Sequence, residues 1–453
     1  MAIEHMIKNY TKGPILRQLI PFAIPFMLSN AMLVAYSIVD MIIVGQFVGA
    51  AGLSAVSISS QIFTFMTMLC VGFATGGQVY ISQLIGSGRN NRLNNTIGTL
   101  FTIVLSIGIL MTFIGLVFKA PILHLLNTPK ESFDYASDYM VVCSIGIIFT
   151  YGYNLISAIF RGLCDSQHPF IFILIASLVN VVLDLYFVCI LHLSVFGAAL
   201  ATILGQAISM ICALVYLYRH RVTFGFDFKI ESFKVDTVVA KSLIKIGLPF
   251  AVQNAAINIS MMFVNTLING LGVYASATFG VGLKLDDIIN KITQGIMFAG
   301  SSMVGQNVAA KEYDRTRKIV YYCIGLSAFF YLGFGIVMLC YPKVLFSFFT
   351  SNSHVIELSV VYVSAILWHY PAMAIMRGGN ALIQGVGNAR LSLIFSILDG
   401  FVFRIGLCYI IGVVFNQGLF GFFLGYGLAA YGTSIPQLLY FLSNRWESYQ
   451  LLK

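Results

Sequence analysis

The chain repeats one apolar pattern in its two halves, about 224 residues apart. Residues 25–31 read PFMLSNA, and residues 249–255 read PFAVQNA. Further pairs keep the same order: Val39-Asp40 with Val264-Asn265; Gly72, Gln83 and Arg92 with Gly295, Gln306 and Arg315; and Arg161-Gly162 with Gln384-Gly385. In a membrane-spanning chain, such duplication is typical of folds in which two similar bundles enclose a site for transport. We therefore expect two structurally similar lobes around a central cavity.

The composition is that of an integral membrane protein. Hydrophobic residues make up 58% of the 453 residues and charged residues only 9%, whereas soluble domains carry about 25% charged residues. Apolar runs long enough to cross about 30 Å of hydrocarbon recur along the chain. We expect an all-α fold of twelve transmembrane helices, near residues 15–45, 53–85, 94–118, 136–159, 169–191, 196–218, 241–268, 275–306, 318–341, 357–383, 391–413 and 418–442.

The positions of the basic residues predict the orientation of the chain. Most of the 26 Lys and Arg residues fall in alternate connections on one side, whereas the other side has only Lys119, Lys130 and Lys343. Cytoplasmic loops carry the excess of Lys and Arg. We expect a multi-pass protein of the cell membrane with both termini in the cytoplasm. The net charge of +9 thus orients the protein and does not indicate a nucleic acid partner.

Six spans in each half start both halves on the cytoplasmic side, so the two repeats should run in the same direction. We expect an amino-terminal lobe over residues 1–218, a cytoplasmic linker over 219–240 and a carboxy-terminal lobe over 241–453. Four phenylalanines of the linker region are expected on the lipid surface: Phe224, Phe226, Phe228 and Phe233. The expected assembly is a monomer that contacts only membrane lipids and small substrates.

Absent motifs exclude several classes of protein. The chain has no Gly-Lys dipeptide and hence no P-loop, and it has neither HExxH nor GxSxG. The eight cysteines form no CxxC pair, so neither a disulfide framework nor a structural metal site is expected. We expect no enzymatic activity and no cofactor; a redox role for Cys164 is the weaker reading of that residue.

Charged side chains inside the expected spans are costly in hydrocarbon and therefore face a cavity or a partner. Away from the span ends, the acids are Asp40, Asp184, Asp286, Asp287 and Asp399, and the bases are Lys284, Lys291, Arg377 and Arg404. All of these bases lie in the second half. The acids of the first half, Asp40 and Asp184, therefore lack an intramembrane cation.

Asp40, Asp184 and Thr202 lie at one depth, roughly 10 Å below the outer surface at 1.5 Å of rise per residue. Each has a polar companion four residues away on the same helix face: Tyr36, Asn180 and Gln206 respectively. Burial favours the protonated form of a carboxyl group, and a second carboxylate nearby adds to this effect. Carboxylate, amide and hydroxyl oxygens also suit an alkali cation. The group predicts a site for H⁺ or Na⁺, and the alternative is hydrogen bonding between helices.

The second half allows two interpretations. Lys284, Asp287 and Lys291 share one helix face, while Asp399 and Arg404 share a span. Mutual ion pairing accounts for most of these charges, and direct contact with a substrate is the alternative. The predicted substrate cavity is lined by Tyr36, Gln206, Asp287, Lys284, Lys291 and Arg404.

Together, these residues resemble the multidrug and toxic compound extrusion (MATE) family over nearly the whole chain. The resemblance rests on the twelve spans in two lobes and on the motifs Pro25, Val39-Asp40, Arg161-Gly162, Asn180-x3-Asp184, Thr202, Pro249 and Gln384-Gly385. The pattern is similar to that of the DinF-like branch. This resemblance implies a cation-coupling site of Asp40, Asn180, Asp184 and Thr202, with Asn154 as a fifth member. The NorM-like branch has acids in helices 7 and 10. The corresponding stretches here, Ala255-Ala256-Ile257-Asn258 and Met373-Ala374-Ile375, contain no carboxylate.

The resemblance implies a secondary antiporter that exports organic, often cationic, compounds in exchange for H⁺ or Na⁺. It also implies that helix 1 bends at Pro21 and Pro25, since each proline removes a backbone hydrogen bond. The alternative function is a flippase for lipid-linked oligosaccharide or polysaccharide precursors, whose cavity should be rich in Arg and Lys to hold a pyrophosphate.

Overall fold

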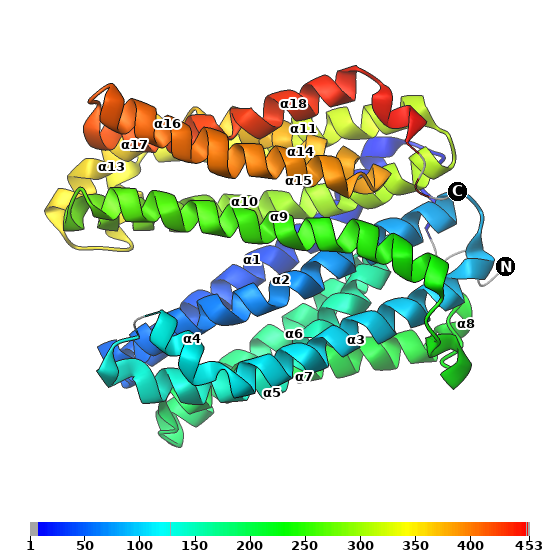
Figure 1. The fold of residues 1–453 in the computed structure, drawn as a ribbon, viewed down its shortest axis with the longest axis horizontal. Coiled ribbons are helices and arrows are strands. Elements are labelled where there is room, and N and C mark those ends of the chain that lie inside the picture. Colours follow the sequence, from blue (N-terminus) through cyan, green and yellow to red (C-terminus); the bar gives the residue numbers. More distant parts are fainter. Residues whose placement is uncertain (1–7, 127, 450, 452–453) are drawn as a thin grey trace. The chain divides into compact units, whose positions relative to one another are not determined.

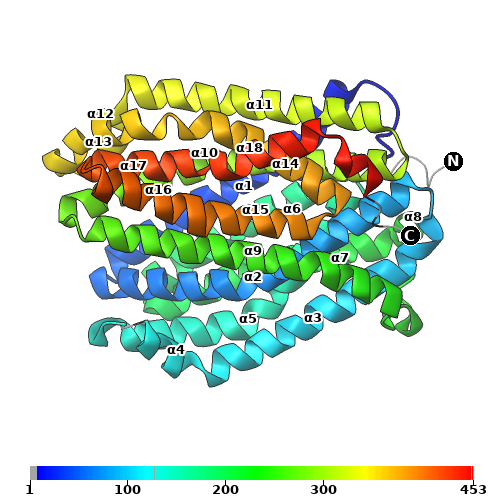
Figure 2. The ribbon, with the colours of Figure 1, turned by 45° about the horizontal axis from the view of Figure 1, so that its top comes forward.

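The computed structural model describes residues 8–126, 128–449 and 451, and in these residues it contains helices and no strand. Figures 1 and 2 show that the chain is built mainly of long helices. Those before the linker are α1 (Ile15–Phe47), α2 (Ala50–Gly86), α3 (Leu93–Val117), α4 (Lys119–Leu125), α5 (Lys130–Gly162), α6 (Gln167–Asp184) with η2 (Leu185–Ile190), and α7 (Ser194–Arg219). The linker contains α8 (Arg221–Phe224) and η3 (Ile230–Phe233).

The remaining helices are α9 (Thr237–Asn269), α10 (Val273–Ala309), α11 (Tyr313–Cys340), α12 (Pro342–Ser347), α13 (Ser353–Ile366), α14 (His369–Val386), α15 (Ala389–Ile397), η4 (Leu398–Arg404), α16 (Ile405–Tyr409), η5 (Ile410–Val414), α17 (Gly418–Ala429) and α18 (Tyr431–Leu442). The segments η2, η4 and η5 are π-helical. Two short turns, η1 (Asn90–Arg92) and η6 (Arg445–Ser448), complete the described elements.

All twelve expected spans are helical. In the described part of the chain, 10 helices are long and apolar enough to cross a membrane, and the bent pair α13 and α14 makes up to 11. The remaining expected span is α10, which has 37 residues but carries Lys284, Asp286, Asp287 and Lys291 within two turns. The prediction of an all-α membrane fold is confirmed.

The bend between α13 and α14 has a local cause. The two helices are inclined by 52° at a short break, and Pro371 lies in the first turn of α14. Proline has no N–H, and its ring clashes with the carbonyl four residues earlier, here that of Leu367. The helix therefore stops next to Leu367 and restarts in a new direction.

The described chain forms two compact units. Of the described residues, those up to Asn9 and those from Leu28 to Ala251 form the first unit, and those from Tyr10 to Met27 and from Val252 onward form the second. The boundaries thus fall inside α1 and α9. The start of α1 packs with the second unit, and the start of α9 packs with the first.

Each unit is organised around one central helix. In the first unit α5 packs against α2, α3 and α7, and in the second α14 packs against α10, α11 and α18. The central helices occupy corresponding places in the two repeats, with Arg161-Gly162 at the end of α5 and Gln384-Gly385 at the end of α14. The sequence repeat is therefore also a repeat of packing.

The linker packs on α3 and not on lipid, so the expected lipid contact of its phenylalanines is wrong for the most buried of them. Phe224 and Phe226 are fully buried, and Phe226 stacks on Phe101 with ring centroids 5.7 Å apart. The Thr102 hydroxyl donates a 2.7 Å hydrogen bond to the Phe233 carbonyl oxygen. Aromatic side chains next to a charged segment were compatible with either surface, and packing against α3, α5 and α7 buries these two.

Candidate functional site

The two acids of the first half lie inside the first unit. Asp40 comes from α1, and Asn180 and Asp184 come from successive turns of α6. Asp184 is fully buried, Asn180 is 3% exposed and Asp40 is 9% exposed. Tyr36 lies one turn before Asp40, and the charges of Asp40 and Asp184 both act on its hydroxyl. The structure thus brings together the residues that the depth argument grouped.

Several polar atoms of this group have no partner among the described residues. They are Oδ1 of Asp40, both carboxylate oxygens of Asp184, and Oδ1 and Nδ2 of Asn180. Buried polar groups in proteins are nearly always hydrogen-bonded, and each exception needs an explanation. Here the unpaired atoms gather on two adjacent helices. Their chemistry, carboxylate and amide oxygens, fits a proton or a small hard cation better than an apolar ligand.

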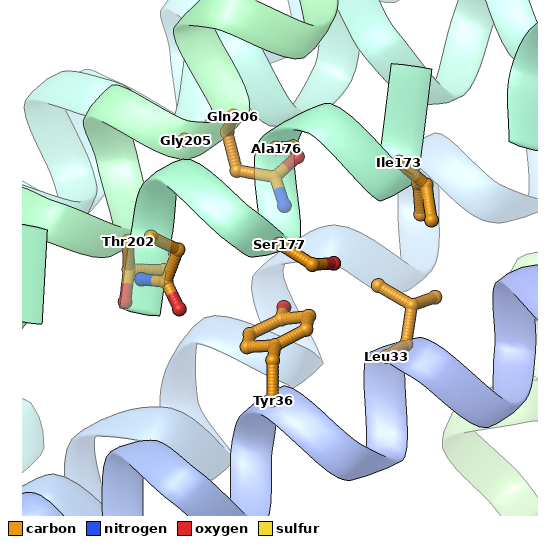
Figure 3. A pocket seen from close by; sticks show the side chains of 9 residues that line it. Leu33, Tyr36, Ile173, Ala176, Ser177, Thr202, Gly205 and Gln206 are labelled. Atoms are coloured by element: carbon orange, nitrogen blue, oxygen red, sulfur yellow. The ribbon is translucent and has the colours of Figure 1, made fainter. Parts of the chain in front are cut away.

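A small cavity adjoins Asn180. Its volume is about 10 Å³, close to the smallest space that holds one water molecule. Figure 3 shows Tyr36 rising from α1 toward Ser177 of α6, with Thr202 and Gln206 of α7 on the opposite side. The cavity is too small for an organic substrate. It has room for about one water molecule, and its lining includes neither Asp40 nor Asp184.

Other predicted residues lie elsewhere. Asn154 donates its side-chain amide to the Thr150 carbonyl oxygen, 2.9 Å away and one turn back in α5, and it does not line the cavity. Pro21 and Pro25 lie inside α1, which runs as one helix from Ile15 to Phe47.

Sequence reasoning missed two residues of α5 beside the acids. Tyr139 and Cys143 are buried, and both interact electrostatically with Asp40. They lie four residues apart on one face of α5. A tyrosine within an apolar span was the available signal, but tyrosine is common at membrane interfaces.

In the second unit, Asp286 is the deeply buried acid of α10. Both of its carboxylate oxygens accept phenol hydrogen bonds, one from Tyr362 and one, of 2.9 Å, from Tyr370. The adjacent Asp287 and the nearby Lys284 are exposed on the surface of the unit. Lys291 is half-buried.

The arginines of the second unit have internal partners. Arg404 Nη2 lies 2.6 Å from Asp399 Oδ2, and its guanidinium lies 5.5 Å from the ring centroid of Tyr426. Arg377 Nη2 donates to the Asn290 carbonyl oxygen at 2.9 Å. Its Nε lies 3.1 Å from the Thr293 hydroxyl. The buried charges of this unit are thus stabilised within it, in contrast to Asp40 and Asp184.

No group of three or more His, Cys, Asp or Glu side chains in the described residues is placed to hold a metal ion. The first unit instead brings two acids, Asp40 and Asp184, near one another. Two carboxylates close together can share one proton or, with neighbouring oxygens, hold one monovalent cation.

The comparisons with known proteins agree with this architecture. The MatE family model matches residues 25–186 and again residues 249–410. A Bacillus subtilis protein named "Probable multidrug resistance protein YpnP" is 26% identical over 444 residues, covering 98% of each chain. A Thermotoga maritima protein named "Probable multidrug resistance protein NorM" is 24% identical over 456 residues, covering 99% of this chain and 97% of that one.

The fold is also that of solved transporters. A structure described as the outward-facing conformation of a multidrug resistance MATE family transporter superposes with a TM-score of 0.92 at 20% identity. The match covers 97% of this chain and 98% of that one. The two family matches fall on the two halves of the internal repeat, and together they span most of the described chain. The chain belongs to the MatE family of multidrug efflux transporters and is a multi-pass membrane transporter, not an enzyme.

Proposed function

We propose that the chain is a secondary antiporter that exports small organic compounds, often cations, in exchange for H⁺ or Na⁺. The observation that carries this proposal is the set of unpaired buried polar atoms of Asp40, Asn180 and Asp184. Leaving buried carboxylates without a cation or a donor is expensive, so an exchangeable proton or ion accounts for their arrangement. Thr202 adds a hydroxyl oxygen, and Asn154 is a further candidate ligand from α5.

Coupling follows from linkage between two ligands and two conformations. An ion and a substrate can drive each other only if they favour opposite states of the protein. A proton or Na⁺ at Asp40 and Asp184 removes negative charge from the first unit and weakens its hold on a cationic substrate. One inward proton supplies about 1.4 kcal/mol per pH unit and about 2.3 kcal/mol per 100 mV. This is enough for a substrate gradient of about one to two decades per driving force.

The substrate is proposed to contact Tyr36 and Gln206 of the first unit and Lys284, Asp287 and Lys291 of the second. Lys284 and Asp287 are exposed near the middle of α10, where charged side chains require water or a polar ligand. Pro21 and Pro25 are proposed to let α1 bend when the ion binds. No cofactor is required by this mechanism.

The orientation belongs to the same proposal. Both termini and the linker 219–240 are placed in the cytoplasm of a cell-membrane monomer, with lobes over residues 1–218 and 241–453, because the basic residues concentrate in that set of connections. Two residues that bear on this orientation, the basic Lys453 at the end of the chain and Asn127 in a connection on the opposite side, lie outside the described residues.

The contacts of the arginines argue against the flippase alternative. A site for a lipid pyrophosphate needs bases that are available to an anion. Arg404 is instead paired with Asp399, and Arg377 donates to Asn290 and Thr293.

Transport by purified protein in vesicles tests the antiport. Vesicles loaded with a fluorescent organic cation are exposed to an imposed Na⁺ gradient, an imposed pH gradient, or neither. Efflux above that of protein-free vesicles under at least one gradient supports the proposal. Dye movement at one rate under all three conditions contradicts it, and binding of a polyprenyl pyrophosphate in place of the dye supports the flippase.

A further inference from the structure

The two halves can be aligned residue by residue from their backbones. Cys164 and Gly387 adopt left-handed conformations after the central helices, with φ of 60° and 81°, and His192 and Asn416 adopt them farther on, both with φ of 53°. Contacts of glycines fix the same alignment: Gly162 on Ile81 with Gly385 on Val304, and Gly197 on Phe187 with Gly421 on Ile411. The interval from Gly387 to Asn416 in the second half is one residue longer than the interval from Cys164 to His192 in the first.

The additional residue is accommodated by the π-helical segment η4. In the first half, the corresponding stretch is the regular helix α6, where Ala176 and Asn180 share a face at a spacing of four. In η4, Asp399 and Arg404 are five residues apart. A π-helix closes its hydrogen bonds at five residues and so brings such residues to one face. All four side chains are buried, which matches Asp399 with Ala176 and Arg404 with Asn180.

This alignment places a different chemistry at the second unit's counterpart of the ion site. The corresponding pairs are Asn154 with Arg377, Asn180 with Arg404, Asp184 with Cys408, and Thr202 with Tyr426. Both amides are thus replaced by arginines, and the carboxylate of Asp184 is replaced by a thiol. Ala176 lines the small cavity of the first unit, whereas its counterpart is a carboxylate, Asp399.

The second unit therefore contains its own cation where the first contains unpaired atoms. Arg404 contacts Asp399 through one 2.6 Å ion pair and lies over Tyr426. The other polar atoms of the pair, Oδ1 of Asp399 and Nε of Arg404, have no partner among the described residues. Asp399 is thus held by a single strong contact, and removing that contact would leave a buried carboxylate with unfilled oxygens.

We propose that the Arg404 guanidinium is a tethered cation that fills the second unit's counterpart of the ion site and closes it to exchangeable H⁺ and Na⁺. The site would then take a monovalent cation only when Arg404 is removed. The interpretation as a closed ion site rests on the proposed function of the first unit, whereas the gain of a site at Asp399 follows from the second unit alone. Coupling would depend on the first unit although the fold is duplicated.

Among the residues that the structure describes, Arg404 is the one direct counterion of Asp399. Tyr426 of α17 interacts with both Asp399 and Arg404. Cys408 of α16 interacts with Arg404. His369 of α14 interacts with Arg404 and Arg377, and its Nδ1 donates to the Gly427 carbonyl oxygen. Asp286 of α10 acts on Tyr426 but is itself bound by two tyrosines. None of these groups supplies a second ion pair to Asp399.

Ion binding by the purified full-length chain tests the proposal. The background is Asp40→Asn/Asp184→Asn, so that the first unit contributes no exchangeable ion. In this background, Arg404→Met should gain one bound monovalent cation per protein, measured as radioactive Na⁺ in equilibrium dialysis or as proton uptake in a potentiometric titration. The two measurements distinguish Na⁺ from H⁺. Adding Asp399→Leu should abolish the gain.

A second variant transplants the first unit's residues, which removes both charges of the ion pair and introduces one carboxyl group. Asp399→Ala/Arg404→Asn/Cys408→Asp reproduces the arrangement of Ala176, Asn180 and Asp184, and it too should bind one additional ion. The proposal is overturned if the Arg404→Met variant and the triple variant both fold but bind no more Na⁺ and no more protons than the background. If the parent binds no more ions than the background variant while Arg404→Met still gains one, the result instead contradicts the ion site of the first unit.

Discussion

Gly72 of α2 lies so close to α9 that a Cβ atom on it would be 2.5 Å from the Gly247 carbonyl oxygen. The repeat reproduces this relationship, because a Cβ on Gly295 of α10 would be 2.5 Å from the Met27 amide nitrogen of α1. Each glycine thus allows the close approach of the first helix of the other half, α9 at Gly72 and α1 at Gly295.

Gly72→Val should destabilise the fold by about 1–3 kcal/mol or more, because the backbone of α9 would have to move to admit the side chain. The measurement is the midpoint of thermal unfolding in detergent, followed by size-exclusion chromatography. Gly280→Ala is the matched control, since nothing lies within 4 Å of its added Cβ, and it should leave the midpoint unchanged or raise it. Equal loss in both variants would show that helix flexibility and not the contact is decisive.

Asp184→Asn should abolish ion-driven efflux while folded protein remains in the membrane. The substitution removes the titratable group but keeps a similar shape. The assay is dye efflux from vesicles with an imposed gradient, and the expected rate is that of protein-free vesicles. Asp138→Asn, which makes the same change at an exposed position of α5, should transport at the parental rate. Parental transport by Asp184→Asn would make that residue structural.

Asp40→Asn should mimic the ion-loaded state and bind a cationic substrate more weakly. The loss of one carboxylate is expected to cost about 1.4 kcal/mol, which is a factor of about ten in the dissociation constant. Binding is measured at high pH without Na⁺, where the acids of the parent are ionised. If variant and parent have equal affinity under these conditions, the charge of Asp40 does not hold the substrate.

Cysteine labelling tests the orientation. Ser232 is buried and bonded to Asp227, so the exposed Glu231 is the better linker position for labelling. A cysteine at Glu231 should react with an impermeant maleimide only after the membrane is opened. A cysteine at Lys130 should react in intact cells, as should the native exposed Cys340, which is replaced before the others are assayed. The opposite pattern would invert the topology.

The docking of the linker should weaken in acid. Hydrogen bonds from the Ser232 hydroxyl, 2.6 Å away, and from the Lys229 amide lower the pKa of Asp227. Because the pKa of an unfolded aspartate is about 3.9, the contribution of Asp227 is complete above that pH and is lost as the pH falls through the lower folded value. Hydrogen exchange over residues 227–236, corrected for the intrinsic rate, should rise below about pH 4. Asp227→Asn should remove this pH dependence, and an unchanged profile in that variant would assign it to another group.

The sequence was sufficient for the helices and the repeat because both depend on long apolar runs and on recurring motifs. It also placed Asp40, Asn180 and Asp184 together, since depth in a membrane follows from the number of residues to the end of a helix. It did not single out Asp286 over Asp287, because neighbouring positions on a helix of unknown rotation are equivalent until its packing is known.

The geometry of the contact between Asp399 and Arg404 could not be predicted from the periodicity of a regular α-helix. Residues five apart are about 140° apart around a regular α-helix, and only the π-helical turn aligns them. The fit of Phe226 against Phe101 was equally inaccessible, since the aromatic content of a linker does not reveal which surface it covers.

The boundary of the two units inside α1 and α9 has a consequence for the assembly of the halves. Each unit contains the beginning of the other half's first helix, and Gly72 and Gly295 lie against these beginnings. A half produced alone therefore lacks the helix segment that packs against its own glycine. Halves separated at the linker should assemble only when they are produced together.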